Sequence, residues 1–248
     1  MILSEKIIKL PIIWELRKFT LYSFYALKAL WQFKSFSIII ASFKYFPVWW
    51  KHLKRDLNPL DCDRPWINFE AKAFLDTILN KQMLVFEYGS GSSTVYFSKR
   101  VKQITSIEND KNWFEHICAY IQNKNICNID YKLIEGEQRE EELAPQYSSS
   151  SLTYKNISFE SYVKSIDLLA DESLDIIVVD GRARNACIKH AADKLKKGGY
   201  LLLDNSNRKE YLIANEFLFD TTKWELMSFA GPVPYAFEFS PTSYFRKK

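Results

Sequence analysis

Short apolar segments alternate with segments of helical periodicity from residue 67 onward. The apolar segments have the length of strands and occupy residues 83–88, 104–108, 129–135, 174–180 and 200–204. The segments with helical spacing occupy residues 67–81, 93 onward, 111–123, 159–169 and 185–197. Strands that are apolar almost throughout are buried on both faces, and their alternation with helices is typical of a parallel sheet covered on each side. The pattern therefore predicts a doubly wound α/β domain.

The C-terminal segment has a different pattern, with two strand-like segments and no helix between them. Residues 224–229 and 236–245 are these two segments, and the stretch from Gly231 to Pro234 between them has turn composition. We expect the two strands to pair antiparallel and to close one edge of the sheet. The sheet is then mostly, not wholly, parallel.

The first 55 residues differ from the rest in being rich in aromatic and basic side chains and free of glycine. Pro11 and Pro47 are their only helix breakers, so we expect two or more helices. One interpretation is that these helices pack on the main body or on a second subunit, with their lysines reaching water. The other is a monotopic anchor on an anionic membrane leaflet, because aromatic and basic side chains together suit the headgroup layer.

Charge separates the same two regions. Residues 1–55 hold ten Lys and Arg against two Glu, a formal charge of +8, and the whole chain carries +4, so residues 56–248 carry −4. A mildly acidic body argues against nucleic-acid binding, which needs a basic face on the folded domain. We therefore expect no nucleic-acid partner, and for residues 1–55 either peripheral membrane contact or a homodimer.

A polar, proline-containing stretch at residues 56–66 is typical of a linker. It marks a boundary between two parts of the chain. We predict a helical extension at residues 1–60 and a main domain at residues 61–248.

Composition also bears on where the protein resides. Glu5, Lys6 and Lys9 interrupt the apolar core that a signal peptide would need, and the longest uncharged runs of the extension are nine residues each. A bilayer-spanning helix needs about 20 apolar residues. The four cysteines form no CxxC pair and the three histidines have no metal-ligand spacing. We expect a cytoplasmic protein, at the inner face of the membrane if the extension is an anchor, with reduced thiols and no zinc.

The loop after the first predicted strand is the first candidate for ligand binding, because ligands of doubly wound sheets lie beyond the carboxyl ends of the strands. It reads Glu87-Tyr88-Gly89-Ser90-Gly91-Ser92-Ser93-Thr94. Gly89 and Gly91 let the backbone approach a ligand, and hydroxyls such as Ser93 and Thr94, with the N-terminus of the next helix, supply donors. A tight turn with a Ser/Thr helix cap is the structural alternative.

Glu108 ends the second predicted strand, nineteen residues after Gly89. An acid at this point can accept both hydroxyls of a ribose, and its structural alternative is an acid at a helix N-terminus. A pyrophosphate would need a third glycine, where Thr94 stands, and no anion nearby, whereas Glu87 is an anion. The carboxylate of Glu87 suits an ammonium group, so the expected ligand is a nucleoside joined to an amino acid.

These residues together resemble the class I S-adenosylmethionine-dependent methyltransferases, through EYGSGSST after an apolar strand, the acid ending the next strand, and VVDG later. The resemblance covers about residues 67–240 and implies a seven-stranded Rossmann-like sheet that binds S-adenosyl-L-methionine. It implies that the glycine loop lies against the methionine portion and that Glu108 holds the ribose. It also implies cofactor contacts by six further residues: Glu87, Gly89, Gly91, Ser93, Thr94 and Asp180. Gly136 and Glu137 would lie toward the adenine, where the match is poor.

Two further strand ends carry oxygen-rich side chains, namely Asp180 on one strand and Asp204 with Asn205 on the next. Such a set can hold a hard cation such as Mg²⁺. It is similar to the metal-dependent catechol and caffeoyl-CoA O-methyltransferases, in which a metal lowers the pKa of the acceptor hydroxyl. The lysine base of those enzymes is replaced by Ala183. The alternatives are that Asp180 lines the methionine end of the cofactor and that Asp204 and Asn205 cap a helix.

The function that the resemblance implies is methyl transfer to an oxygen, or less readily a nitrogen, of a small molecule or glycan precursor. Methyl transfer needs alignment and exclusion of water, with a base only if the acceptor keeps a proton. Asp180 is the candidate base. Arg182 and Arg184 either grip an anionic group of the acceptor or are surface charges of a loop. The alternatives are an NAD-dependent oxidoreductase and a non-catalytic, membrane-associated scaffold of the same fold.

Overall fold

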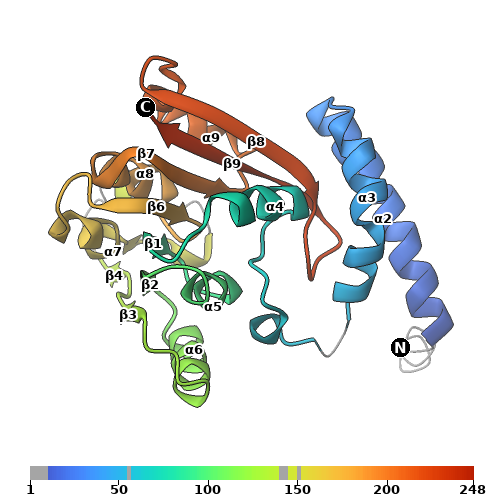
Figure 1. Ribbon diagram of the computed structural model, residues 1–248, viewed down its shortest axis with the longest axis horizontal. Helices are drawn as coiled ribbons and strands as arrows, with labels where there is room; N and C mark the ends of the chain where they lie inside the picture. Colours follow the sequence, from blue (N-terminus) through green and yellow to red (C-terminus); the bar gives the residue numbers. More distant parts are fainter. Residues whose placement is uncertain (1–10, 55–56, 140–144, 150–151) are drawn as a thin grey trace.

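A computed structural model describes residues 11–54, 57–139, 145–149 and 152–248, so that Glu5, Lys6 and Lys9 lie outside the described residues. Its centre is a seven-stranded sheet in the order β3-β2-β1-β6-β7-β9-β8 (Figure 1). Strands β3, β2, β1, β6 and β7 are parallel, and β9 pairs antiparallel with both β7 and β8. The strands, in chain order, are β1 Leu84–Tyr88, β2 Gln103–Glu108, β3 Ile129–Leu133, β6 Leu174–Val179, β7 Leu195–Asp204, β8 Trp224–Pro232 and β9 Phe239–Lys247.

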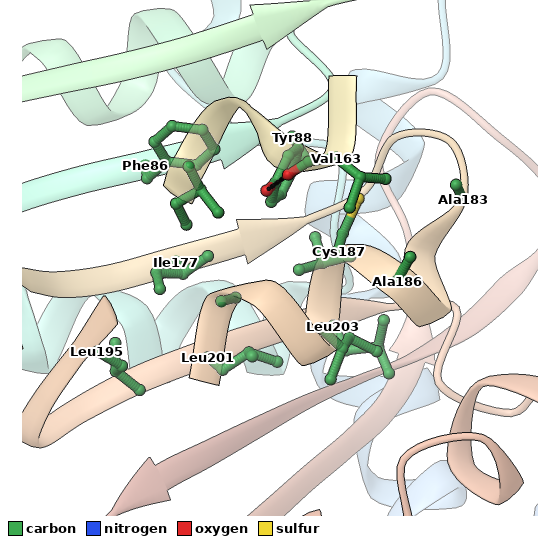
Figure 2. Close-up of a cluster of buried hydrophobic side chains, with 14 of the residues drawn as sticks. Phe86, Tyr88, Val163, Ile177, Ala183, Ala186, Cys187, Leu195, Leu201 and Leu203 are labelled. Atoms are coloured by element: carbon green, nitrogen blue, oxygen red, sulfur yellow. Dashed lines mark hydrogen bonds between the residues drawn. The ribbon is translucent and has the colours of Figure 1, made fainter. Parts of the chain in front are cut away.

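Helices cover both faces of the sheet, which confirms the predicted doubly wound α/β fold. On one face, β1, β6 and β7 alternate their apolar side chains toward α7 and α8, as Figure 2 shows for Phe86, Ile177, Leu201 and Cys187. The intervening side chains face α4 and α5 on the other side, where Val85, Ile176 and Leu202 are buried. The helices of the main body are α4 Phe69–Ile78, α5 Ser92–Ser98, α6 Lys111–Asn123, α7 Glu160–Lys164, α8 Arg184–Lys194 and α9 Lys209–Ile213.

The predicted C-terminal strand pair is confirmed as β8 and β9, which complete the sheet beyond β7. The turn begins after Pro232, slightly later than predicted, because Gly231 still pairs with Ser240 within the ladder. Strand β7 begins at Leu195 and ends α8 earlier than expected, since Leu195 pairs with Leu174 of β6. A small second sheet pairs β4 (Glu137–Gln138) with β5 (Ile157–Ser158).

Five short 3₁₀ helices complete the described secondary structure. They are η1 Pro59–Cys62, η2 Pro145–Tyr147, η3 Leu152–Tyr154, η4 Ser165–Leu168 and η5 Glu216–Phe219. The first lies in the stretch predicted to be a linker, and the structure attaches that stretch firmly to the body. Leu60 is buried, and Asp63 makes two hydrogen bonds with the guanidinium of Arg100, at 2.9 and 2.7 Å.

The N-terminal region forms two helices, α2 (Pro11–Phe33) and α3 (Ser37–His52), which lie side by side at one end of the molecule (Figure 1). We call them the helical hairpin. It contacts the main body through β8 and β9, with Trp49 and Tyr22 packed against Phe239 and Phe69. Pro11 begins α2 as expected, but Pro47 lies inside α3 and does not break it. A proline inside a helix lacks the N–H that would bond to the carbonyl four residues earlier, and the helix continues past it to His52, with Trp49 buried. No helix within the described residues is both long and apolar enough to cross a bilayer.

Candidate functional site

The turn after β1 touches the end of β6 at Gly89. Gly89 has a φ of +88°, and a Cβ added to it would lie 2.8 Å from the Cα of Gly181, so no other residue fits without strain. The backbone N–H of Asp180 donates to the carbonyl of Tyr88 at 3.0 Å. This contact lies at the point where the strand order reverses, between β1 and β6, which is where ligands bind in doubly wound sheets.

Glu87 lies fully buried beneath this turn, contrary to the expectation that its carboxylate contacts the ligand. Because side chains alternate along β1, Glu87 points to the face that α5 covers. Its Oε2 accepts hydrogen bonds from the hydroxyls of Thr94 at 2.5 Å and Ser106 at 2.7 Å, while Oε1 has no partner within the described residues. Burial raises the pKa of Glu87 to about 7.

Thr94 is also buried, and it connects Glu87 to the glycine loop. Its hydroxyl oxygen accepts the backbone N–H of Gly91 at 3.0 Å while the hydroxyl donates to Glu87. Glu87 and Thr94 thus hold the loop in shape from behind, and any influence of Glu87 on a ligand acts through this support and through its charge.

Gly91, in contrast, faces open space. Its φ of 171° is extended backbone that any residue adopts, and an added Cβ would meet no atom within 4 Å. No constraint of the fold that we describe requires glycine at this position. The missing side chain therefore leaves room for a ligand to lie directly on the loop.

Glu108 is held at the end of β2 by four donors. Its Oε2 accepts the N–H of Ser90 at 3.1 Å and the hydroxyl of Ser90 at 2.6 Å. Its Oε1 accepts the N–H groups of Asn109 at 2.7 Å and Asp110 at 2.9 Å. A carboxylate has about four lone-pair sites, so a ligand hydroxyl can bind Glu108 only by replacing one of these donors. The Ser90 hydroxyl can leave, because it lies equally close to the hydroxyl of Tyr131, at 2.6 Å.

Two adjoining cavities open at these strand ends. The Glu108 cavity, of about 360 Å³, is lined by Gly89, Glu108, Asn109, Gly181 and Arg182 among others. The Asp204 cavity, of about 370 Å³, is lined by Gly91, Ser93, Asp204, Asn205, Glu238 and Ser240 among others. Ser90, Trp113 and Asp180 line both, so the two cavities adjoin, and we call them together the hollow. Of the nine predicted site residues, Glu87 and Thr94 lie behind its wall, and the other seven line it: Gly89, Gly91, Ser93, Glu108, Asp180, Asp204 and Asn205.

Asp180 stands where the two cavities meet and is paired with Arg184. Its Oδ1 accepts from the Arg184 guanidinium at 2.7 Å, and the same guanidinium donates to the carbonyls of Asp180, Gly181 and Asp204. Burial raises the pKa of Asp180, and the positive charge of Arg184 opposes the rise. Asp204, behind it, has a pKa raised to about 7 by burial and by the nearby charge of Asp180.

The two predicted arginines have different surroundings. Arg184 is nearly buried, and its N–H groups donate to Asp180 after β6 and to the carbonyl of Asp204 at the end of β7. It therefore links these two strand ends and is not free to bind an acceptor. Arg182 lies over the ring of Tyr154, 4.5 Å from its centroid, and lines the Glu108 cavity. Arg182 alone remains a candidate for contact with an anionic group.

The donors of the predicted Mg²⁺ site lie along one wall, but their arrangement does not fit a divalent cation. The Arg184 guanidinium bonds Asp180 and puts a positive charge where a cation would bind. Asp204 accepts from the hydroxyl of Thr242 at 2.8 Å, and the side-chain amide N–H of Asn205 donates to Ser240. Within the part of the chain that the structure describes, no three His, Cys, Asp or Glu side chains gather as metal ligands. We therefore derive no step of a reaction through a metal.

Two tryptophans of the site were not predicted. Trp66 and Trp113, each partly exposed, line the Asp204 cavity, and the Trp113 indole N–H donates to the carbonyl of Ser90 at 3.0 Å. The periodicity predicts a helix over residues 111–123 but assigns Trp113 no part in the site. Its position in the first turn of α6, after a strand end, was the signal that could have identified it.

The helical hairpin also contributes to the site, indirectly. The indole N–H of Trp49 donates to the carbonyl of Ala236 at 2.8 Å, and Trp14 and Trp49 contact the ring of Phe237. These residues belong to the loop between β8 and β9, whose Val233, Ala236 and Glu238 line the Asp204 cavity. The extension thus holds one wall of the hollow in place.

Comparison with known proteins supports the fold. No family model matches the chain. Among curated proteins, the ribosomal RNA small subunit methyltransferase A of Mesomycoplasma hyopneumoniae is 31% identical over 106 residues, which is 40% of this chain and 41% of that protein.

Solved structures match over more of the chain. A candidate methyltransferase from Streptococcus mutans, in complex with S-adenosylhomocysteine, matches with a TM-score of 0.51 and 13% identity, over 71% of this chain and 95% of that one. An rRNA methylase from Streptococcus thermophilus matches with a TM-score of 0.51 and 12% identity, over 74% of this chain and 97% of that one. The predicted fold, that of the class I S-adenosylmethionine-dependent methyltransferases, is thus confirmed.

The prediction that nucleic acid is no partner is contradicted by the same comparisons. The curated relative and one of the two structures are described as acting on ribosomal RNA. A net charge of −4 over residues 56–248 is an average, and it does not exclude a local basic contact such as Arg182 beside the hollow.

Proposed function

We propose that this chain, which has the fold of the class I methyltransferases, transfers the methyl group of S-adenosyl-L-methionine to an acceptor bound beside Asp180. The observation that carries the proposal is Gly91, whose open side faces a hollow with Glu108 at one end and Asp180 at the junction of its two cavities. When bound, the cofactor supplies a methyl group on a positively charged sulfur, and the carbon–sulfur bond breaks as the acceptor's lone pair forms the new bond.

The residues of the hollow then have separable tasks. Glu108 accepts the ribose hydroxyls after the Ser90 hydroxyl moves away, while the Asn109 and Asp110 N–H groups keep its carboxylate in place. Gly91 allows the amino-acid portion to lie on the loop. Arg184 pairs with Asp180, and burial raises the pKa of Asp204 and Glu87 to about 7, so these acids carry part of their formal charge near neutral pH. This partial negative charge favours a cationic ligand over a pyrophosphate.

Asp180 is the proposed proton acceptor, when the acceptor group carries a proton. It lines both cavities, so it can reach an acceptor that lies against the methyl group. Burial raises its pKa, which makes its carboxylate a better base than a free aspartate. Arg184 keeps the carboxylate oriented, as a positioning residue.

The favoured acceptor is a nucleobase of RNA. The names of the relatives support it, and so do Trp66 and Trp113, because partly exposed aromatic side chains beside a cavity are the surfaces on which unstacked bases are bound. An oxygen of an aromatic small molecule would use the same two rings, and it is the second candidate.

Binding and transfer test the proposal separately. Titration calorimetry should give a Kd for S-adenosylhomocysteine in the micromolar range, about −8 kcal/mol, and no binding of NADH. Tight NADH binding would favour the oxidoreductase alternative, and absence of both would favour the scaffold. Labelled S-adenosylmethionine should then transfer its methyl to ribosomal RNA that lacks its natural modifications, and Asp180→Asn should lower the rate by a larger factor than it raises the Kd. Transfer to small aromatic hydroxyls but not to RNA would select the second candidate.

A further inference from the structure

The helical hairpin has one face buried and one face exposed. Tyr22 and Ala29 of α2 and Ile38, Ala41 and Trp49 of α3 are buried by the contact with each other and with β8 and β9. This face accounts for the packing that the sequence predicted.

The outward face is apolar, and its residues are large. Its exposed fractions include 80% for Trp31, 83% for Phe36 and 80% for Phe43, which is unusual for side chains of this size. Further exposed apolar side chains on the same two helices are Leu16, Phe19, Phe24, Leu27, Ile39 and Ile40. A helix turns about 100° per residue, so the exposed apolar residues of α2 fall within an arc of about 140°, away from Tyr22 and Ala29. We call this surface the apolar face of the hairpin.

A groove of about 640 Å³ runs between the two helices within this face. Its lining is almost wholly apolar and includes Phe19, Leu27, Ile39, Phe43 and Phe46. The groove has the lining and the volume to admit hydrocarbon between the helices.

Basic residues border the apolar face. Arg17 and Lys28 lie within about 40° of Phe24 on α2, and Lys51 lies about 20° from Ile40 on α3; all three are exposed, as is Lys34 in the turn between the helices. No acidic residue occurs from 16 to 55, and residues 1–55 together carry +8.

We propose that the apolar face of the hairpin inserts into an anionic membrane surface, with α2 and α3 lying in the plane of the interface. Apolar and aromatic side chains would enter the boundary between headgroups and acyl chains, and the bordering Arg and Lys would contact anionic headgroups. A second copy is the less favourable occupant, because pairing two such faces would bring two charges of +8 together without a counter-charge. The proposal does not depend on methyl transfer.

Flotation of the full-length protein with lipid vesicles tests the inference. The protein should float with phosphatidylcholine vesicles that contain phosphatidylserine, float weakly with phosphatidylcholine alone, and lose much of its binding in high salt. Changing Lys28→Glu and Lys34→Glu should each weaken binding by about fivefold or more, as expected for a basic residue at such a surface. The triple variant Trp31→Ser, Phe36→Ser, Phe43→Ser should abolish flotation.

A matched control comes from the main body. Leu168 is 89% exposed, like the three hairpin residues, but it lies in η4, outside the hairpin and directly after Asp167. Leu168→Ser should leave flotation unchanged, and circular dichroism should show every variant folded. The inference is overturned if the wild type stays unbound with anionic vesicles, or if the triple variant still floats. It is equally overturned if sedimentation shows a dimer that the triple variant alone dissociates and vesicles do not compete.

Discussion

The main body and the helical hairpin differ in how far their large apolar side chains are buried. In the body, β1, β6 and β7 bury their apolar side chains on both faces of the sheet, under helices. Figure 2 shows one of these two faces. In the hairpin, large apolar side chains are buried on one face and exposed on the other. Hydrophobic content alone therefore does not distinguish a core from a binding surface, whereas the direction in which each side chain points does. The apolar side chains of the body are covered by its own helices and by the hairpin, whereas the hairpin keeps an exposed apolar face.

The largest effect is expected at the centre of the body. Gly89→Val should destabilise the protein by more than about 3 kcal/mol, because it combines a strained positive φ with overlap against the Gly181 backbone. Urea denaturation measures the loss. An unchanged midpoint would mean that β1 and β6 do not meet as described.

Within the hairpin, the two faces should respond differently to the same change. Trp49→Ala should cost about 3–5 kcal/mol, since the side chain is fully buried and hydrogen-bonded to Ala236. Trp31→Ala, on the apolar face, should change the unfolding free energy by less than about 0.5 kcal/mol. Equal effects in thermal or urea unfolding would remove the distinction between the faces.

Glu87→Gln should make stability less dependent on pH. The pKa of Glu87 rises from 4.5 unfolded to about 7 folded, so its contribution to stability is full below pH 4.5 and is lost as the pH rises toward 7. The variant has no charge to bury, and it should be more stable than the wild type above pH 7, by about 1–3 kcal/mol. Urea midpoints from pH 5 to 8 measure this. A wild type that grows more stable over that range relative to the variant would contradict it.

Gly91→Ala separates binding from folding. The added methyl enters open space, so the unfolding midpoint should stay within experimental error, while the Kd for S-adenosylhomocysteine should rise about tenfold, or about 1.4 kcal/mol. Calorimetry on the folded variant gives the answer. Unchanged affinity would place the ligand elsewhere.

The smallest effect is expected from removal of metal ions. Because Arg184 is paired with Asp180, methyl transfer should be unchanged in a strong chelator. A large loss, restored by Mg²⁺ and absent in Asp204→Ala, would instead support the metal site that the sequence predicted.

The sequence predicted most of the fold and part of the site, for identifiable reasons. The helices of the body have clear periodicity and its strands are short apolar segments. The turn at Gly89 and the position of Glu108 at a strand end also follow from the local sequence. Neighbouring side chains of β1 point to opposite faces of the sheet, and both faces are buried. The sequence pattern of such a strand does not show which face receives Glu87. The pairing of Arg184 with Asp180, and the approach of Trp66 and Ala236 to the hollow, depend on contacts between distant segments.

The hydrogen bond from Trp49 to Ala236 has a practical consequence for how the two regions can be separated. A shortened protein that starts after α3 would not be a catalytic unit freed of an accessory, because Phe237 and Phe239 would lose their cover and the loop beside Glu238 would lose its brace. Loss of activity on such a truncation would say nothing about lipid binding. Single substitutions on the apolar face of the hairpin can test lipid binding without removing this support. Through the same contact, any movement of α2 and α3 at a bilayer would shift the loop that lines the Asp204 cavity.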